Sequence, residues 1–195
     1  MRKDLTPFLP PCFFEDPVTT VQAMGCQIIK VSRLKWAGIF SLSNGQRIFL
    51  KRDQVKNWKG FFKWFMLPSH ARKEWSTAYQ LQKKNLNVPK PLGWAERGQW
   101  GSVKECYYLS EAIGSGSSLM DYPNIRETFS ILALAKIVRD FHEAGLFHRD
   151  LHGGNLLWDG QSFFLTDLHR AKILRSLSLD QKLWNFSQLF HSLRS

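Results

Sequence analysis

Acidic residues and cysteines are scarce in this sequence, and it has no long apolar run. Aspartate and glutamate number 16 against 27 lysines and arginines, which gives a formal charge of +11. This excess predicts an anionic partner, and a nucleotide, a phosphorylated sugar, a nucleic acid and an acidic membrane surface all fit it. The three cysteines, Cys12, Cys26 and Cys106, lack metal-binding or CxxC spacing and fit reduced, cytosolic thiols.

No apolar stretch approaches the roughly 20 residues that a membrane-spanning helix needs. The N-terminal run Met1–Asp4 is followed by Pro7, Pro10 and Pro11, which excludes a signal-peptide core there. Hydrophobic residues still make up 44% of the 195 residues. The composition therefore predicts a globular protein, either one domain or two small lobes, and excludes a disordered chain.

The most informative stretch is His148-Arg149-Asp150, followed by Asn155 and then by Asp167. It fits the pattern H-R-D-x-x-x-x-N of kinase catalytic loops, after which a strand presents a metal-binding aspartate. In phosphoryl transfer one carboxylate orients the attacking hydroxyl and accepts its proton, while an amide oxygen and a second carboxylate hold Mg²⁺. The alternative is a loop of turn-capping residues, which does not explain the two short apolar runs that follow.

The N-terminal half contains three predicted strands after an irregular, proline-rich lead-in over residues 1–20. The strands are Gln27–Val31, Ile39–Leu42 and Arg47–Lys51, and Ser43–Gly45 has the composition of a hairpin turn. Three strands that end in a lysine are typical of the beginning of a kinase N-lobe.

Lys51 is therefore the candidate phosphate-binding lysine, with Arg52 as its competitor and an ordinary strand-end lysine as the alternative. A typical glycine-rich phosphate loop is missing, because the segment between the first two strands has the single glycine Gly38. Arg33 or Lys35 is a candidate phosphate contact in that segment, and a solvated loop charge is the other interpretation.

A helix is predicted from Ser69, its N-cap, to about Lys84. Glu74, Ala78 and Leu81 fall on one face of it. A carboxylate on an apolar face needs a partner, because burying it alone is costly. Lys51 is the obvious partner, and a surface glutamate paired with basic neighbours on the helix is the alternative.

Two further strands, Leu92–Ala95 and Lys104–Ser110, are followed by Glu111-Ala112-Ile113 and the Gly/Ser run 114–118. This change of composition predicts a lobe boundary. In a kinase such a hinge offers backbone groups to adenine, which makes Glu111 and Ile113 candidate ATP contacts, as is Leu157 in the apolar run after Asn155. The alternative is a flexible linker.

The C-terminal half is predicted to hold a buried helix over Ile125–Ala144, ended by Gly145, a strand over Phe163–Thr166 and a last helix over about Leu179–Leu193. Only about ten residues separate Asp167 from the last predicted helix and no Ala-Pro-Glu occurs, so we expect the peptide-docking platform of protein kinases to be absent. The acceptor is therefore expected to be a small or lipid-linked hydroxyl.

The segment Lys56–Leu67 combines three lysines and five aromatic residues with no acidic residue. Basic residues beside large aromatics suit a membrane interface. Packing of the aromatic stripe on the sheet is the alternative.

Four segments together resemble the bacterial lipopolysaccharide core kinases, the Kdo and heptose kinases of Gram-negative bacteria. They are Ser69–Trp75, Val88–Gly93, His148–Leu157 and Thr166–Ala171. By motif order, the resemblance covers roughly Gln27–Leu193. It implies an α+β, two-lobed, protein-kinase-like fold, with an N-lobe and hinge over about 21–113 and a compact helical C-lobe over about 114–195.

The resemblance also implies ATP- and Mg²⁺-dependent phosphorylation of an inner-core sugar at the cytoplasmic face of the inner membrane, with no nucleic acid partner. By position, Asp150 would be the catalytic base, Asn155 and Asp167 the metal ligands, and Lys51 with Glu74 the phosphate-anchoring pair. Two more residues each have two alternative roles. His152 resembles a histidine of aminoglycoside phosphotransferases and would touch the γ-phosphate or order the loop; Arg170 would bind an anionic acceptor or form a structural ion pair.

Two other functions remain open from the sequence. One is a kinase for a soluble small molecule or for a protein, which a requirement for anionic lipid would distinguish. The other is a catalytically silent kinase-like module that binds a partner, and the intact Asp150, Asn155 and Asp167 argue against it.

Overall fold

The structure is a computed structural model, which describes residues 9–55, 64, 66–99, 102–122 and 131–193. The chain divides into two compact units. The first consists of Met1–Trp75 and Lys90–Ala112, and the second of Ser76–Pro89 and Ile113–Ser195. Helices and antiparallel strands occur together, which confirms the predicted α+β class.

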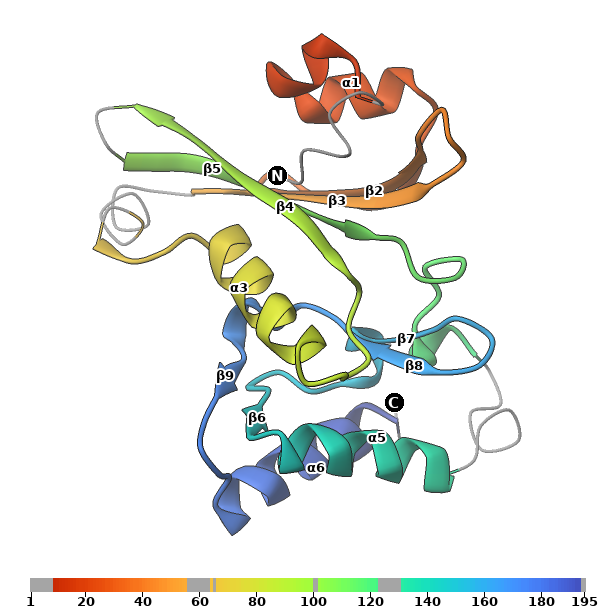
Figure 1. Ribbon diagram of the computed structural model, residues 1–195, viewed down its shortest axis with the longest axis vertical. Helices are drawn as coiled ribbons and strands as arrows, with labels where there is room; N and C mark the ends of the chain where they lie inside the picture. The colour runs from red at the N-terminus through yellow and green to blue at the C-terminus, as the bar shows by residue number, and fades with distance from the viewer. Residues whose placement is uncertain (1–8, 56–63, 65, 100–101, 123–130, 194–195) are drawn as a thin grey trace. The chain divides into compact units, whose positions relative to one another are not determined.

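The first unit is built on a five-stranded antiparallel sheet with the strand order β1-β2-β3-β5-β4 (Figure 1). Every predicted strand of this unit is present, and most are longer than the sequence pattern indicated. The strands are β1 (Gln27–Val31), β2 (Lys35–Ser41), β3 (Arg47–Gln54), β4 (Pro91–Gln99) and β5 (Ser102–Glu111).

Alternation along β3 separates the residues that pack from those that form a polar cluster. Ile48 and Leu50 join the larger hydrophobic cluster of the unit, on one face of the sheet. Because successive side chains of a strand point to opposite faces, Lys51 and Asp53 lie on the other face. Lys51 pairs across the ladder with Tyr108, which belongs to a second, smaller cluster.

A short helix, α1 (Pro17–Ala23), precedes the sheet and packs onto the larger cluster. Asp16 caps it, because its carboxylate accepts hydrogen bonds from the backbone N–H of Thr19 at 3.2 Å and from the Thr19 hydroxyl at 2.7 Å. The helix begins at a proline, whose missing N–H costs nothing in the first turn. The irregular lead-in predicted to residue 20 was therefore wrong at Pro11–Phe14, a short 3₁₀ helix, and from Pro17 onward. Residues 1–8 lie outside the described chain.

Helix α3 (His70–Gln82) begins in the first unit and ends in the second. The Ser69 hydroxyl accepts the backbone N–H of Arg72 at 3.2 Å, so the predicted N-cap is confirmed. Glu74, Ala78 and Leu81 are all buried, as their common spacing predicted.

Among its described residues the second unit has the end of α3, the helices α5 (Ile131–Glu143) and α6 (Leu179–Ser192), and two pairs of short strands. The predicted start of α5 at residue 125 lies outside the described residues. Gly145 follows α5 with φ +78°, where a Cβ would collide with the carbonyl of Leu174. This confirms Gly145 as the end of the helix. The strand pairs are β6 (Leu146–Phe147) with β9 (Lys172–Ile173), and β7 (Leu156–Trp158) with β8 (Phe163–Leu165).

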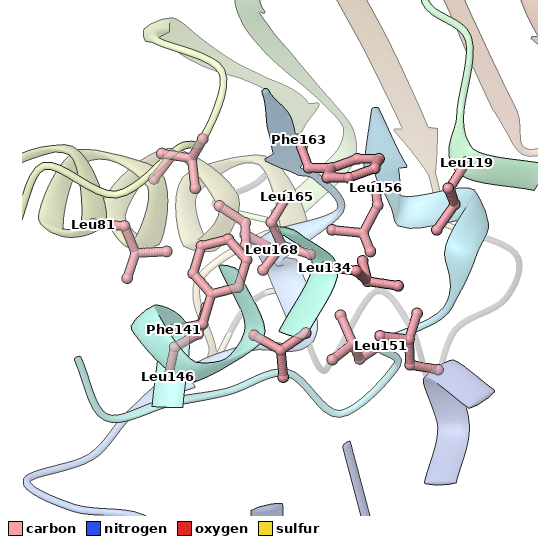
Figure 2. Packing of buried hydrophobic residues seen from close by; sticks show 14 residues of the cluster. Leu81, Leu119, Leu134, Phe141, Leu146, Leu151, Leu156, Phe163, Leu165 and Leu168 are labelled. Atoms are coloured by element: carbon pink, nitrogen blue, oxygen red, sulfur yellow. The ribbon is translucent and has the colours of Figure 1, made fainter. Parts of the chain in front are cut away.

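One hydrophobic cluster holds this unit together, as Figure 2 shows. Phe141 of α5 and Leu156 and Leu165 of the β7–β8 pair are almost completely buried in it. Burial of a side chain of this size stabilises a fold by about 1.5–3 kcal/mol. The cluster therefore fixes β7, which directly follows the predicted catalytic loop, and β8, which ends just before Asp167.

The predicted membrane-contact segment, Lys56–Leu67, lies mostly outside the described residues. Trp64 is described, and it is buried, with its ring centroid 5.2 Å from that of His70 in an edge-on arrangement. Met66 and Leu67 are exposed. At Trp64 the packing interpretation holds. No helix in the described ranges has the length and apolar character needed to cross a membrane.

Candidate active site

The predicted pair of Lys51 and Glu74 is present in the first unit. Lys51 Nζ lies 2.9 Å from Glu74 Oε2, and the two side chains are 13% and 5% exposed. Arg52 points to the opposite face of β3, so strand alternation excludes it from this pair. The alternative of a surface glutamate paired along its own helix is wrong, because Glu74 is buried.

Asp53, two residues after Lys51, adds a second buried carboxylate that the sequence analysis missed. It lies 3.8 Å from His70 and 3.9 Å from Lys35. Burial acts to raise the pKa of Asp53, but the interaction with His70 and the charges of Lys51 and Lys35 outweigh it, so its pKa is below the usual range. The sequence could have indicated Asp53, because residues two apart on a strand, such as Lys51 and Asp53, point to the same face of the sheet.

A tight, basic turn stands where a kinase would have its glycine-rich loop. The Ser32 N–H donates to the Lys35 carbonyl at 2.8 Å, and the Ser32 hydroxyl accepts the Lys35 N–H at 3.1 Å. Lys35 directs its ammonium towards Asp53, while Arg33 is exposed. Arg33 is therefore the better placed of the two candidate phosphate contacts, and this role remains a prediction.

The predicted ATP contacts Glu111, Ile113 and Leu157 all lie among the described residues. In the first unit, the Glu111 carboxylate lies 2.9 Å from Lys90 Nζ and accepts from Gln46 at 3.3 Å. In the second, the Ile113 carbonyl accepts the Gly116 N–H at 2.9 Å in a turn, and Leu157 lies in β7 opposite Phe164. Their contact with adenine remains a prediction.

The second unit brings the three residues of the catalytic motif together through hydrogen bonds. Asn155 donates from Nδ2 to the Asp150 carbonyl at 2.9 Å. Its own carbonyl accepts the Thr166 N–H at 2.9 Å and the Thr166 hydroxyl at 3.1 Å. Because Thr166 immediately precedes Asp167, these bonds tie the loop that carries Asp150 to the strand end that presents Asp167.

His148 orders the start of the loop as a buried, neutral imidazole. Its Nε2 lies 3.2 Å from the Thr166 carbonyl, and its Nδ1 accepts the Asp150 N–H at 3.3 Å. A carbonyl only accepts and an N–H only donates, so Nε2 must carry the proton and Nδ1 must be bare. Burial holds the pKa of His148 below its usual value, consistent with this tautomer.

His152 acts on its own loop. Its Nδ1 accepts the Gly154 N–H at 3.1 Å and caps the short 3₁₀ helix Gly153–Asn155. Of the two roles considered from the sequence, the structure supports loop ordering. Contact with a γ-phosphate remains a prediction.

Asp167 is held in an unusual backbone conformation, with φ 56° and ψ 45°. A left-handed backbone at a residue other than glycine costs of order 1–3 kcal/mol, and such residues cluster at functional sites. Its Oδ1 lies 2.7 Å from Nδ1 of His169, whose side chain is 7% exposed. His169 was not among the predicted site residues. The sequence could have indicated His169 as a site residue, because it ends the run Asp-Leu-His where a protein kinase has Asp-Phe-Gly.

Arg170 forms a long contact with the candidate base. Its Nη1 lies 3.5 Å from Asp150 Oδ2, and the two side chains are 61% and 39% exposed. An exposed pair at this distance adds little to stability. Arg170 is thus beside the candidate base without being fixed there by burial.

The donor set suits Mg²⁺, which prefers oxygen ligands and usually binds through one or two carboxylates. Asn155 uses its amide nitrogen on the Asp150 carbonyl, so its side-chain oxygen is the atom left to face a cation. Asp167 supplies a carboxylate. The residues present therefore fit the metal that the motif predicts.

The lysine–glutamate pair of the first unit, and the polar loop and left-handed aspartate of the second, are the features that the kinase motifs predict. The model of the lipopolysaccharide kinase (Kdo/WaaP) family matches residues 22–194. The chain belongs to this family. The resemblance inferred from the motifs is thereby confirmed.

Two curated relatives and one solved structure are similar to the chain. Both relatives are lipopolysaccharide core heptose(I) kinases named WaaP. The one from Escherichia coli strain K12 is 28% identical over 120 residues, and another from Escherichia coli is 26% identical over 120. Each match covers 53% of this chain and 45% of the relative, so the chain matches less than half of their length.

The solved structure is WaaP in complex with acyl carrier protein, with a TM-score of 0.60 and 18% identity. The match covers 95% of this chain and 79% of that one. At this identity it shows the fold, and it confirms the kinase-like architecture predicted from the motifs.

Proposed function

We propose that the protein is an ATP- and Mg²⁺-dependent kinase that phosphorylates a sugar hydroxyl of the lipopolysaccharide inner core, on Kdo or heptose. The observation that carries the proposal is the network joining Asp150, Asn155 and Thr166, which brings the base and both metal-ligand candidates into one hydrogen-bonded loop. Family membership supports the substrate class.

Each site residue has one role in this proposal. Asp150 orients the acceptor hydroxyl and takes its proton, while Lys51, fixed by Glu74, binds the nucleotide phosphates. Asn155 and Asp167 hold Mg²⁺, which when bound offsets negative charge on the phosphates. Glu111, Ile113, Leu157 and His152 complete the ATP site as further contacts.

Arg170 is proposed to bind an anionic group of the acceptor. Its exposed guanidinium sits 3.5 Å from the candidate base, so a carboxylate or phosphate bound by Arg170 would lie close to Asp150. This would select acidic sugars over neutral ones.

Two partners of the enzyme are also proposed. The solved relative is WaaP in complex with acyl carrier protein, which makes an acyl carrier protein a candidate partner here. The basic, aromatic composition of residues 56–67 favours peripheral contact with the cytoplasmic face of the inner membrane.

The test is phosphate transfer from ATP to purified core oligosaccharide, followed by mass spectrometry of the product, with Asp150→Asn as the matched control. A mass gain of one phosphate on Kdo or heptose with the wild type alone supports the proposal. Transfer to soluble small molecules or proteins but not to core sugar would replace the substrate class. Metal-dependent ATP binding without turnover on any acceptor would favour a silent binding module.

A further inference from the structure

Three polar side chains on one face of α6 contact the backbone of the catalytic loop. Asn185, Gln188 and Ser192 follow one another at spacings of three and four residues, which places them on the same side of the helix. Their hydrogen bonds reach peptide groups between His148 and Gly153. The loop is therefore held by side chains from a helix more than 25 residues further along the chain.

Gln188 binds both peptide groups that flank Asp150. Its Nε2 donates to the Arg149 carbonyl at 3.3 Å, and its Oε1 accepts the Leu151 N–H at 3.2 Å. The carbonyl belongs to the peptide bond before Asp150, and the N–H belongs to the one after it. Peptide groups are planar, so one side-chain amide restrains both backbone torsions of the candidate base.

The other two side chains fix the loop on either side of that point. Asn185, 1% exposed, donates from Nδ2 to the His148 carbonyl, and its Oδ1 lies 3.3 Å from His142 Nε2. Because the amide oxygen can only accept, Nε2 of His142 is the donor. The Ser192 hydroxyl accepts the Gly153 N–H at 2.9 Å and donates to a carbonyl of its own helix.

We propose that α6 positions the catalytic loop, and that Gln188 is the positioning residue that sets the backbone of Asp150. The inference rests on the proposed function, because it assigns Asp150 as the base. Proton transfer demands hydrogen-bond distance between the base and the hydroxyl, and a misplacement of about 1 Å can lower a rate by about 10²-fold. The amide of Gln188 removes the freedom that would allow such a misplacement.

The kinetic test compares Gln188→Leu with Gln80→Leu. Gln80 is an exposed amide on α3 that bonds to Ser76 one turn earlier, so its loss controls for the removal of a helix amide. Gln188→Leu is expected to lower kcat by about 10-fold or more while the KM for ATP changes by less than about twofold, because only the base is displaced. Gln80→Leu should leave both unchanged.

Gln188→Glu separates positioning from a general structural role. It keeps the acceptor for the Leu151 N–H but loses the donor to the Arg149 carbonyl, so one of the two restraints on Asp150 is removed. The kcat should therefore fall by about 10-fold or more while the KM for ATP changes by less than about twofold. A kcat equal to that of the wild type, or an equal loss in kcat and affinity for ATP, would overturn the proposal.

A second readout needs no activity. Hydrogen exchange at the Leu151 amide should become faster in Gln188→Leu, and exchange at Gly153 should become faster in Ser192→Ala. Ser187→Ala, on the exposed side of α6, should change neither. Unchanged exchange at Leu151, or an unchanged kcat, in a folded Gln188→Leu would refute the positioning role. If Gln188→Leu does not fold, the kinetics of Gln188→Glu decide whether Gln188 has the positioning role. An inactive wild type would instead refute the proposed function, and the exchange data would still test the contact.

Discussion

Lys51→Met should destabilise the first unit more than Glu74→Gln, although the two side chains form one ion pair. Two unit charges 2.9 Å apart attract each other by about 6 kcal/mol at an effective dielectric constant of about 20, before desolvation is subtracted. Breaking a buried pair by removing one partner costs about 3–5 kcal/mol, because the other charge is left uncompensated.

The asymmetry comes from Asp53. Lys51→Met leaves two buried carboxylates, Glu74 and Asp53, without their shared cation, so the full cost of about 3–5 kcal/mol is expected. Glu74→Gln leaves Lys51 with Asp53 and a neutral amide of similar shape. Its cost should be about 1.5–3 kcal/mol, the contribution of a hydrogen bond to a charged group.

The assay is urea unfolding at pH 7, with both single variants and the double variant. The double variant should lose less than the sum of the singles, because the residues are in contact. Additive losses would mean that the pair does not form. A greater loss for Glu74→Gln than for Lys51→Met would refute the role given to Asp53.

Four further outcomes are expected. Asp150→Asn should lower turnover by about 10²-fold or more while nucleotide affinity, measured by calorimetry, is unchanged; nearly wild-type turnover would contradict the base assignment. Asp167→Ala should abolish Mg²⁺-dependent ATP binding, and retained binding with the same metal dependence would exclude it as a ligand. The unfolding free energy should fall as pH decreases below about 6.5, because burial lowers the pKa of His148 and His142 and the unfolded chain takes up protons there first; His142→Gln should flatten that slope between pH 8 and 5.5. Changing Lys56, Lys59 and Lys63 to Gln should reduce sedimentation with anionic vesicles at low salt, and equal binding by the variant would make the segment structural.

Local patterns in the sequence were sufficient for most elements of the first unit. The bounds of β1 agree with the pattern, and Glu74 is buried because it falls on the apolar side of a helix with a clear cap. Helix α1 was missed because the proline-rich stretch to residue 20 was interpreted as irregular. Asp16 is in fact an N-cap, and Pro17 after it is the proline that helices accept in their first turn.

Features that depend on long-range pairing could not be obtained from the sequence. Strands β6 and β9 have two residues each, too few to carry a period, and they exist because Leu146 lies opposite Ile173. This pairing returns the chain after Asp167 towards the start of the catalytic loop, where Arg170 meets Asp150. Motif spacing predicted the candidate site residues, whereas the contacts of Asp53, His169 and Arg170 follow from register and from where the chain turns back.

Helix α6 shows why an apolar pattern alone can mislead about which side of a helix faces inward. Leu183, Phe186 and Phe190 form its apolar side in the sequence, yet Leu183 and Phe190 are 56% and 51% exposed, while Asn185 is 1% exposed. A catalytic loop has few backbone partners of its own, and burying unpaired N–H and C=O groups costs more than exposing parts of two hydrophobic side chains. The helix therefore turns its amides towards the loop, and the geometry of Asp150 takes precedence over the burial of its leucine and phenylalanine side chains.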